Sequence, residues 1–457
     1  MARNTQVSAD HNAPPITDIL ARHVAEHASR GWSDAVEHEA LRTWLNWVGC
    51  AIGAAQHDSV QSALAAMQAF DSAPQASLLG RSERVDMGAA ALINGISSHT
   101  FDFDDTHLKT IIHPAGPVAS ALLALAEHRH FSGRQIIDAL VLGIDVSCRI
   151  GNCMYPDHYD RGWHITGSTG SVGAAAACAR LLGLNVQQTA MAMGIAASQP
   201  IGMREQFGTM TKPFHPGGSA RAGLTSALLA QNGFTASAKA LEAPRGYIQT
   251  VSTKHDWSEI TNELGKRFEI SFNTYKPFAC GIVVHPSIDA CVQLRAKGIT
   301  PEQIERIDLK VHSLVLELTG KKTPSNGLES KFSVYHSCAV GLIFGRAGEH
   351  EYTDAVVNSP AVLALRAKVE AIVDDRISEA AADVRVQTHD GRDLHIVIEH
   401  AIGSTQRPMS EAQLKAKFVD QSAPVLGQAK AEQSWALASC LAGCADLGPL
   451  LAAATLS

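Results

Sequence analysis

Residues 169–184 read TGSVGAAAACARLLGL, a run of alanine and glycine that ends in leucines and has helical spacing. Small side chains at such spacings let neighbouring helices approach closely. Similar alanine-rich segments follow one another over residues 88–270, where alternating β-branched runs are almost absent. Helical spacing of Leu, Val, Trp and Ala also marks residues 16–56, with Ser33–Asp34 as a helix start. The sequence therefore predicts a large all-helical domain over residues 16–274.

The pattern changes near residue 275. Residues 303–320 alternate between apolar and polar side chains as a strand does, and residues 382–401 hold two such runs around Asp390–Gly391, a hairpin signal. We expect a smaller α+β lid domain over residues 275–405. We expect the helical residues 406–457 to dock back on the first domain. The predicted fold class is mainly α.

Composition excludes several classes of protein. The chain has 457 residues, a net charge of −7 and 5% aromatic residues, without a Lys/Arg run, so nucleic acid is not an expected partner. We find no apolar run of about 18 residues, hence no expected membrane span. Residues 1–15 are polar and predict a disordered arm rather than a secretory signal. Nine scattered cysteines without a CxxC pair indicate free thiols in a reducing cytosol, so we expect a cytoplasmic protein.

Histidine precedes proline three times, at His113, His215 and His285, each time before an apolar helical stretch. Proline favours the first helical position, so each histidine is expected just outside a helix N-terminus. His164 likewise precedes a Gly/Ser/Thr-rich helix entry. That end of a helix attracts anions and disfavours imidazolium, which leaves a neutral ring able to act as a base. The alternative is that each histidine is only a polar residue at a helix start.

Two Lys–Pro–Phe segments accompany these histidines, TKPFHPGGSARAG and YKPFACGIVVHPSIDA. The residue before proline is driven into an extended conformation, which would project Lys212 and Lys276 from loops. Both lysines are candidate clamps for substrate carboxylates. The glycines and serine at 217–219 could add backbone N–H groups in a turn that binds anions. The alternative is two solvated loop lysines.

The stretch FDFDDTHLKTIIHP begins at residue 101 and concentrates ionisable side chains. Helical geometry over residues 94–107 would put His99, Asp102 and Thr106 on one face, with Asp104 roughly opposite as a cap or a solvated residue. A carboxylate beside a histidine orients the ring and stabilises its protonated form, as general acid–base catalysis requires.

Two other interpretations of this stretch stay open. It could be a plain polar helix end, or a metal site whose possible ligands are Asp102, Asp105, His107 and His113. No dense carboxylate set elsewhere supports a metal, so none is predicted. The segment GSTGSVG at residues 167–173 lacks the GxGxxG spacing and follows no predicted strand, which argues against a dinucleotide site.

At these segments the chain resembles the MmgE/PrpD family, which contains 2-methylcitrate dehydratase, cis-aconitate decarboxylase and iminodisuccinate epimerase. The resemblance covers about residues 16–420 and is carried by INGISSHTFDFDDTH, HPAGPVASALLALAE, RGWHITGSTGSVGAAAA, FGTMTKPFHPGGSARAGLTSALLAQNGFTAS and YKPFACGIVVHPSIDA. It implies a large helical domain with a small α+β lid, a homodimer, a site in the cleft between the domains, and neither a metal nor an organic cofactor. The family's site positions fall on Asp102, Thr106, His113, His164, Lys212 and Lys276, with His107 as the other histidine of that stretch.

We therefore expect a cofactor-independent lyase that acts on a small di- or tricarboxylate. Lys212 and Lys276 would hold carboxylates and stabilise developing negative charge. His113 or His164 would move the proton, and Asp102 would orient a histidine. Substrate contacts are assigned to Thr106, His107, His215 and His285.

The order of preference among reactions is dehydration of the 2-methylcitrate type, then decarboxylation of the cis-aconitate type, then epimerisation. All three share a proton transfer next to a carboxylate, so the sequence leaves them competing. A carboxylate-binding protein without catalysis is the non-enzyme alternative.

Overall fold

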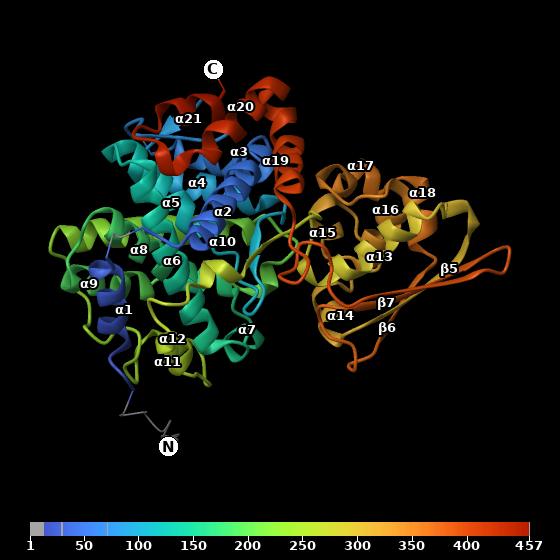
Figure 1. Cartoon of the computed structure of the whole chain (residues 1–457), viewed down its shortest axis with the longest axis horizontal. Helices are drawn as coiled ribbons and strands as arrows, with labels where there is room; N and C mark the ends of the chain where they lie inside the picture. The colour runs from blue at the N-terminus through green and yellow to red at the C-terminus, as the bar shows by residue number, and fades with distance from the viewer. Residues whose placement is uncertain (1–12, 29–30, 71, 457) are drawn as a thin grey trace.

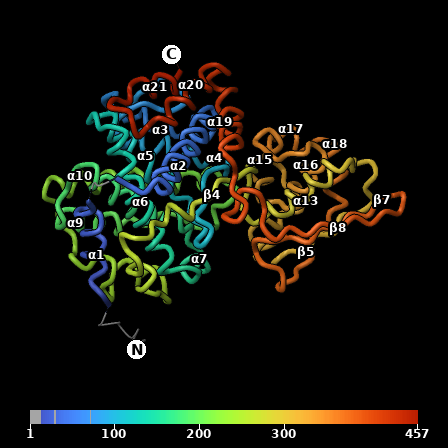
Figure 2. Tube along the Cα trace, viewed as in Figure 1, coloured from blue at the N-terminus to red at the C-terminus, as the bar shows by residue number. Residues whose placement is uncertain are grey.

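The computed structural model describes residues 13–28, 31–70 and 72–456, which form two lobes (Figures 1 and 2). The larger lobe is a stack of helices, and the smaller lobe holds a four-stranded sheet with helices beside it. The predicted mainly α fold is confirmed. Most of the predicted N-terminal arm, residues 1–12, lies outside the described residues.

Within the described residues, the larger lobe contains nine main helices that precede the smaller lobe in the sequence and three that follow it. The first group is α1 (Ile16–Glu26), α2 (Asp34–Gly53), α3 (Asp58–Met67), α4 (Met87–Thr100), α5 (Ala115–Arg129), α6 (Gly133–Met154), α8 (Ile165–Leu181), α9 (Val186–Ala197) and α10 (Thr211–Gln231). The second group is α19 (Glu411–Leu426), α20 (Gln428–Ser439) and α21 (Gly448–Ala454). Short helices α7 (Asp157–Asp160), α11 (Tyr247–Val251) and α12 (Ser258–Thr261) join them, as do the two-stranded pair β1 (Ala76–Ser77) and β2 (Arg84–Val85).

Small residues at the helix crossings bring α4, α6, α8 and α10 unusually close together. A Cβ atom added to Gly95 on α4 would stand 2.5 Å from the Cα atom of Gly217 on α10. One added to Gly143 on α6 would stand 2.6 Å from the Cβ atom of Ala177 on α8. Close packing of this kind tolerates no larger side chain. It fixes the ends of α4, α8 and α10 relative to one another.

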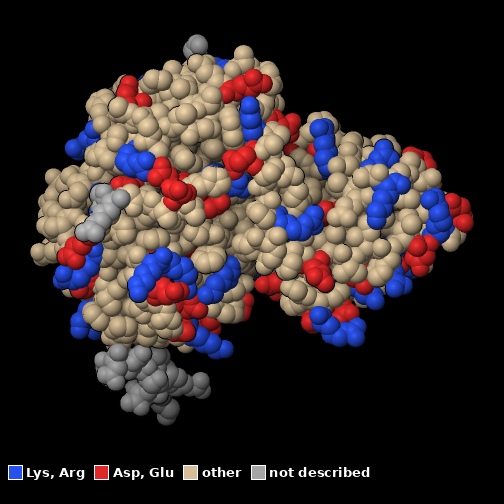
Figure 3. Space-filling model, viewed as in Figure 1, with Lys and Arg blue, Asp and Glu red and all other residues tan. Residues whose placement is uncertain are grey.

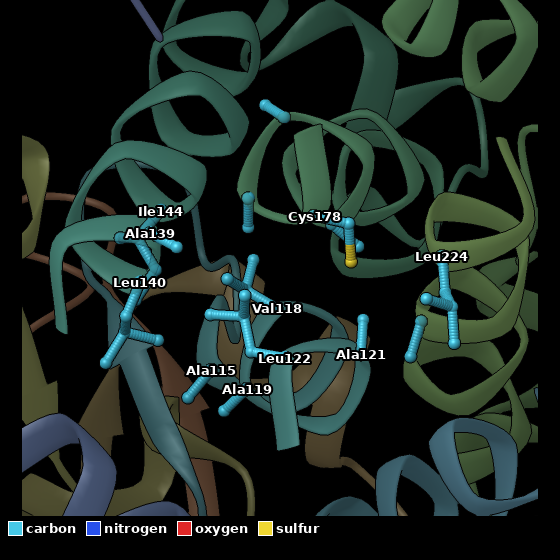
Figure 4. Close-up of a cluster of buried hydrophobic side chains, with 14 of the residues drawn as sticks. Ala115, Val118, Ala119, Ala121, Leu122, Ala139, Leu140, Ile144, Cys178 and Leu224 are labelled. Atoms are coloured by element: carbon cyan, nitrogen blue, oxygen red, sulfur yellow. The ribbon is translucent and has the colours of Figure 1, made fainter. Parts of the chain in front are cut away.

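The helices of the larger lobe share one core. Figure 4 shows part of it, where Val118 and Leu122 of α5 face Leu140 and Ile144 of α6. Phe418 of α19 belongs to the same core, so the C-terminal helices pack on the larger lobe. The domain boundaries predicted from the sequence stay a prediction.

The smaller lobe has its own core around a sheet in the order β6–β5–β7–β8. Its strands are β5 (Ile304–Val311), β6 (Val369–Val373), β7 (Ala382–Thr388) and β8 (Asp393–Ile398), with β5 parallel to β6 and antiparallel to β7. Its helices are α13 (His285–Ala296), α14 (Ser313–Thr319), α15 (Gly327–Ser330), α16 (Val334–Phe344), α17 (Asp354–Val357) and α18 (Pro360–Arg366). β7 alternates between buried and less buried residues because one of its faces packs on helix α13.

The hairpin expected around Asp390–Gly391 is present as β7 and β8. Gly391 has a φ of 84°, a left-handed conformation that suits glycine. The prediction of a single strand over residues 303–320 is correct only for its first half, where β5 lies. The chain leaves the sheet after Val311, and His312 caps helix α14 by accepting a hydrogen bond from the Leu314 N–H.

No helix in the described part of the chain combines the length and the apolar character needed to cross a membrane. Acidic and basic side chains are interspersed over the face drawn in Figure 3, in keeping with the absence of a basic run in the sequence.

Candidate active site

A short antiparallel ribbon links two distant parts of the chain and sets the geometry of the site. It consists of β3 (Asp105–His107) and β4 (Asn273–Tyr275), with Asp105 opposite Tyr275. Because the strands are antiparallel, the residues just before Asp105 and just after Tyr275 leave the ribbon at the same end. Asp102 and Lys276 meet there.

Asp102 is the charged centre of the site. Its Oδ1 atom lies 2.9 Å from Lys212 Nζ and 2.7 Å from Lys276 Nζ. All three side chains are buried, with residue exposures of 4%, 6% and 1% for Asp102, Lys212 and Lys276. Burial alone would raise the pKa of Asp102, but the two ammonium groups outweigh it and hold that pKa well below its usual value. Asp102 is therefore a carboxylate.

The two lysines respond differently to the same carboxylate. Burial lowers the pKa of Lys212 despite its contact with Asp102. Burial also opposes the charge on Lys276, but the attraction of Asp102 and Asp104 prevails and raises its pKa. Lys276 gains a further hydrogen bond to the Asp102 carbonyl at 3.0 Å. Lys212 is thus the ammonium group that more easily gives up a proton.

His113 presents a free ring nitrogen to the site. It lies just before α5, and its Nδ1 atom is 2.6 Å from the Asp105 carbonyl oxygen, which can only accept. Nδ1–H therefore donates, and Nε2 is the atom left to accept a proton, without a hydrogen-bond partner among the described residues. Burial lowers the pKa of His113 to about 3, so the ring is neutral near pH 7.

A second carboxylate, Asp104, lies behind the histidines. Its Oδ2 atom is 2.7 Å from His99 Nδ1, and its Oδ1 atom is 3.5 Å from His113 Nδ1. Burial would raise the pKa of Asp104, but the neighbouring His99 and His113 rings lower it. Asp104 therefore fixes the orientation of His99 and adds negative charge beside His113.

His164 completes the group of rings. It is the residue at the N-cap of α8, and its Nδ1 atom lies 2.8 Å from Nδ1 of His215, so one of these two nitrogens carries the proton. Burial holds the pKa of His164 well below its usual value and that of His215 at about 4. The ring of His164 is centred 6.4 Å from that of His113.

These groups surround a small, partly open cavity between the lobes. Asp102, His113, His164, Lys212 and Lys276 all line it, together with apolar and aromatic residues of both lobes: Ile111, Tyr159, Phe207, Ile282, Val283, Leu318 and Phe332. Its volume is about 40 Å³, enough to hold a water molecule. Phe207, Leu318 and Phe332 also line an outer pocket of about 960 Å³.

Four residues predicted for the site lie beside the cavity rather than on its wall. His107 binds Glu269 and Thr110 at 3.1 and 2.8 Å. His285 lies 3.4 Å from the Cys280 carbonyl, and His215 stands behind His164. The Thr106 hydroxyl is 3.3 Å from His113 Nδ1.

The predicted helix over residues 94–107 is wrong, because α4 ends at Thr100 and the chain turns into β3. Asp102 has a φ of 52° at this turn, which removes it from any helix face. Its carboxylate binds two lysines, and it is Asp104, expected opposite as a cap or a solvated residue, that orients a histidine.

Four further expectations about local conformation are also wrong. Lys212 lies in the first turn of α10 rather than in a loop, and His215 lies inside that helix. The Gly–Gly–Ser segment 217–219 is helical too, and there Gly217 lies so close to α4 that an added Cβ would clash with the Leu92 carbonyl oxygen. His285 is the first residue of α13 rather than the residue before it. His113 and His164 do lie at helix beginnings, as predicted.

Sequence reasoning did not select His99 or Asp104 as site residues. The available signal was the repeated aspartate of FDFDD directly after SSHT. The aromatic wall formed by Tyr159, Phe207 and Phe332 had no local signal.

The side chains most able to hold a metal differ from those weighed above. His99, His113 and His164 each offer a nitrogen, and these atoms lie within 4.8 Å of one another. Lys212 and Lys276 line the same cavity, and their positive charges oppose a bound cation.

Two domain models of one protein family match most of the chain. The model of the MmgE/PrpD N-terminal domain matches residues 18–260, and that of the MmgE/PrpD C-terminal domain matches residues 278–442. A cis-aconitate decarboxylase of Aspergillus terreus is 25% identical over 98% of this chain and 97% of its own length. The cis-aconitate decarboxylase-like protein oryM of Aspergillus oryzae is 26% identical over 91% of this chain and 92% of its own.

The 2-methylcitrate dehydratase of Escherichia coli strain K12 is 26% identical over 52% of this chain and 53% of its own length. These relatives are thus named as decarboxylases or dehydratases. The two domain models together span most of the sequence, and the chain belongs to the MmgE/PrpD family.

Proposed function

We propose that this protein is a lyase that acts on a small di- or tricarboxylate by proton transfer next to a carboxylate, without a metal or an organic cofactor. The observation that carries the proposal is the shared cavity. Two ammonium groups, Lys212 and Lys276, and two neutral histidines, His113 and His164, line the same cavity. Positive charge for a polyanion and bases for its proton are thereby adjacent.

The ammonium groups supply binding and charge stabilisation. A substrate carboxylate that approaches Lys212 and Lys276 shares their positive charge with Asp102. Negative charge that develops on the substrate is then stabilised in a water-poor site, where such contacts are strong. Removal of one such donor typically costs about 3–4 kcal/mol of transition-state stabilisation.

His113 Nε2 is the proposed base. Its pKa of about 3 in the free protein makes it a weak one, because burial disfavours imidazolium. A bound polyanion adds negative charge beside the ring and raises that pKa, so the base strengthens when substrate is present. Lys212, whose pKa burial lowers, is the proposed acid.

The reaction can follow either of two courses from the same groups. In decarboxylation the C–C bond to a carboxylate breaks, CO₂ leaves with neither electron of that bond, and the carbon takes a proton from Lys212 or a histidine. In dehydration His113 takes a C–H proton, and the hydroxyl leaves as water after protonation. The sequence motifs placed dehydration first. The matches to decarboxylases over 91–98% of the chain favour testing decarboxylation first, with epimerisation third.

The cavity has to widen before a substrate enters. Small-molecule sites span about 300–1,000 Å³, whereas water-sized space here is about 40 Å³. Phe207 of the larger lobe and Phe332 of the smaller lobe stand between the cavity and the outer pocket. Separation of the lobes at these rings would open the site to the outer pocket.

Proton NMR in deuterated water tests the proposal. The protein is incubated with cis-aconitate, 2-methylcitrate, citrate or iminodisuccinate. Product signals separate the three reactions, and deuterium incorporation locates the labile C–H. Tight binding of a tricarboxylate without any product would support the non-enzyme alternative instead. Light scattering of the purified protein tests the homodimer, and cell fractionation tests the cytoplasmic location.

A further inference from the structure

Three consecutive carbonyl groups around Asp102 each accept a hydrogen bond from a buried lysine. The Phe101 carbonyl accepts from Lys331 Nζ at 2.7 Å, and the Asp102 carbonyl accepts from Lys276 Nζ at 3.0 Å. The Phe103 carbonyl accepts from Lys417 Nζ at 2.6 Å. The three lysines are separated from their acceptors by 230, 174 and 314 positions in the sequence.

Lys331 and Lys417 also rest on the aromatic rings of the same turn. Lys417 Nζ lies 4.1 Å from the centre of the Phe103 ring, and Lys331 Nζ lies 5.6 Å from that of Phe101. Each lysine therefore contacts one neighbour of Asp102 through both its carbonyl group and its ring. Such cation–π contacts strengthen when water is excluded.

The turn needs external support because Asp102 is strained. Its φ of 52° is a left-handed conformation that non-glycine residues adopt only when the surroundings hold them there. The ribbon formed by β3 and β4 starts only at Asp105, so it does not hold residues 101–103 itself. Lys331, Lys276 and Lys417 donate to these carbonyls, and the Phe103 carbonyl accepts a further, longer hydrogen bond from the Cys50 thiol at 3.4 Å.

The two flanking lysines come from opposite sides of the site. Lys331 precedes α16 in the smaller lobe, where its ammonium group also binds the Ala279 carbonyl at 2.8 Å and Glu349 at 2.6 Å. Lys417 lies on α19, where its other partner is Asn46 Oδ1 at 2.7 Å.

A buried ammonium group that binds neutral oxygens is costly to keep. Lys331 and Lys417 are 2% and 7% exposed. Lys331 has the Glu349 carboxylate, but Lys417 forms no ion pair with a described residue, and burial lowers its pKa to about 8. An apolar residue of similar volume would tie α19 to the larger lobe without the cost of desolvating a charge. Structural attachment alone thus does not explain the charge.

We infer that Lys331 and Lys417 are positioning residues, which hold the Phe101 and Phe103 carbonyls so that Asp102 keeps its carboxylate between Lys212 and Lys276. The inference rests on the proposed function, because Asp102 matters through the site it organises. Neither lysine lines the cavity. Both act on substrate only through Asp102.

The test compares lysine-to-methionine variants in pairs. Lys331→Met and Lys417→Met keep the length of the side chain and remove the charge. Lys368→Met and Lys430→Met are the matched controls, because these half-buried lysines also donate to a backbone carbonyl, in the smaller lobe and on α20 respectively. Each full-length variant is assayed for kcat, KM and urea midpoint with the substrate found by NMR.

The expected result is a fall in kcat on the order of 10- to 100-fold for the two positioning variants, since small misplacements in a site have effects of this size. The controls should stay within about twofold of the parent. Lys417→Arg, which keeps the charge, should recover part of the loss. When Asp102 is already replaced by Asn, adding Lys417→Met should lower kcat by less than about twofold relative to Asp102→Asn alone, because the carboxylate that Lys417 positions is absent.

A kcat for both variants within about twofold of the parent would overturn the inference, and so would an equal fall in the controls. Full additivity in the Asp102→Asn background would also overturn it. If Lys417→Met does not fold, Lys417→Gln, which retains a donor, takes its place.

Crystal structures of the variants keep this test separate from the proposed function. Should the parent convert none of the carboxylates, the proposed function fails, but the position of Asp102 can still be measured. A change in the Asp102 φ, or loss of its contact with Lys276, supports positioning. An unchanged turn refutes it.

Discussion

Replacing Asp102 with Asn should destabilise the protein in a way that depends strongly on pH. The substitution keeps the size of the side chain but removes the carboxylate that Lys212 and Lys276 share at 2.9 and 2.7 Å. Two buried ammonium groups then lack their common counter-charge. Removing one partner of a buried ion pair typically costs about 3–5 kcal/mol. Lys212 is the group expected to lose its proton, because burial already lowers its pKa.

Deprotonation sets an upper limit to that cost. At pH 7, removing the proton from a lysine whose unfolded pKa is about 10.4 takes about 1.36 kcal/mol for each of about 3.4 pH units, or about 4.6 kcal/mol. At pH 9 the same step takes about 1.9 kcal/mol. The folded variant binds fewer protons than its unfolded state below the unfolded pKa, so its stability rises with pH over this window. The deficit relative to the parent therefore shrinks as pH rises.

Urea unfolding at pH 7, 8 and 9, followed by the fluorescence of buried Trp44 and Trp47, measures this deficit. Asp393→Asn, at an exposed position on β8, is the matched control and should show little effect at any pH. A deficit for Asp102→Asn that is the same at pH 7 and pH 9 would refute the reasoning. A deficit below about 1 kcal/mol, the scale of a surface pair, would refute it too.

Four further outcomes are expected. Replacing His113 with Asn should lower kcat by about 10²- to 10⁴-fold through loss of the base, whereas His389→Asn on the exposed hairpin should stay near the parent, and equal effects in the two would contradict the assignment. The pH profile of kcat/KM reports the free protein, in which the pKa of His113 is about 3, so kcat/KM should not fall as the pH drops through 6.5. Bound substrate raises that pKa, so kcat should begin to fall at a higher pH than kcat/KM does. Acidic limbs at the same pH in both profiles would argue against His113 as the base. Glu317→Gln removes the salt bridge that Arg204 forms with Glu317 at 2.5 Å in the outer pocket. The free energy of unfolding should change by less than about 1 kcal/mol, while stopped-flow association of a tricarboxylate should become faster. An unchanged association rate would show that this salt bridge does not restrict entry. Treatment with EDTA should leave turnover intact because ammonium groups hold the carboxylates, and a loss reversed by a divalent cation would disprove this.

The sequence by itself determined the helical layers, several helix starts and the hairpin of the smaller lobe. These features depend on contacts between residues close in the chain. Ser33 caps α2 by accepting a hydrogen bond from the Val36 N–H, and Asp390–Gly391 supplies the turn between β7 and β8. The family motifs also identified Asp102, His113, His164, Lys212 and Lys276, which the structure brings to one cavity.

Tertiary structure alone decided what those residues contact. The turn that holds Asp102 has no periodicity of its own, and its three carbonyls accept hydrogen bonds from Lys331, Lys276 and Lys417, which are far away in the sequence. For this reason a helical wheel put Asp102 beside a histidine and Asp104 opposite, as a cap or a solvated residue, whereas the fold buries both, Asp102 against two lysines and Asp104 against His99. Partners more than a hundred residues away impose that conformation, and local spacing carries no information about them.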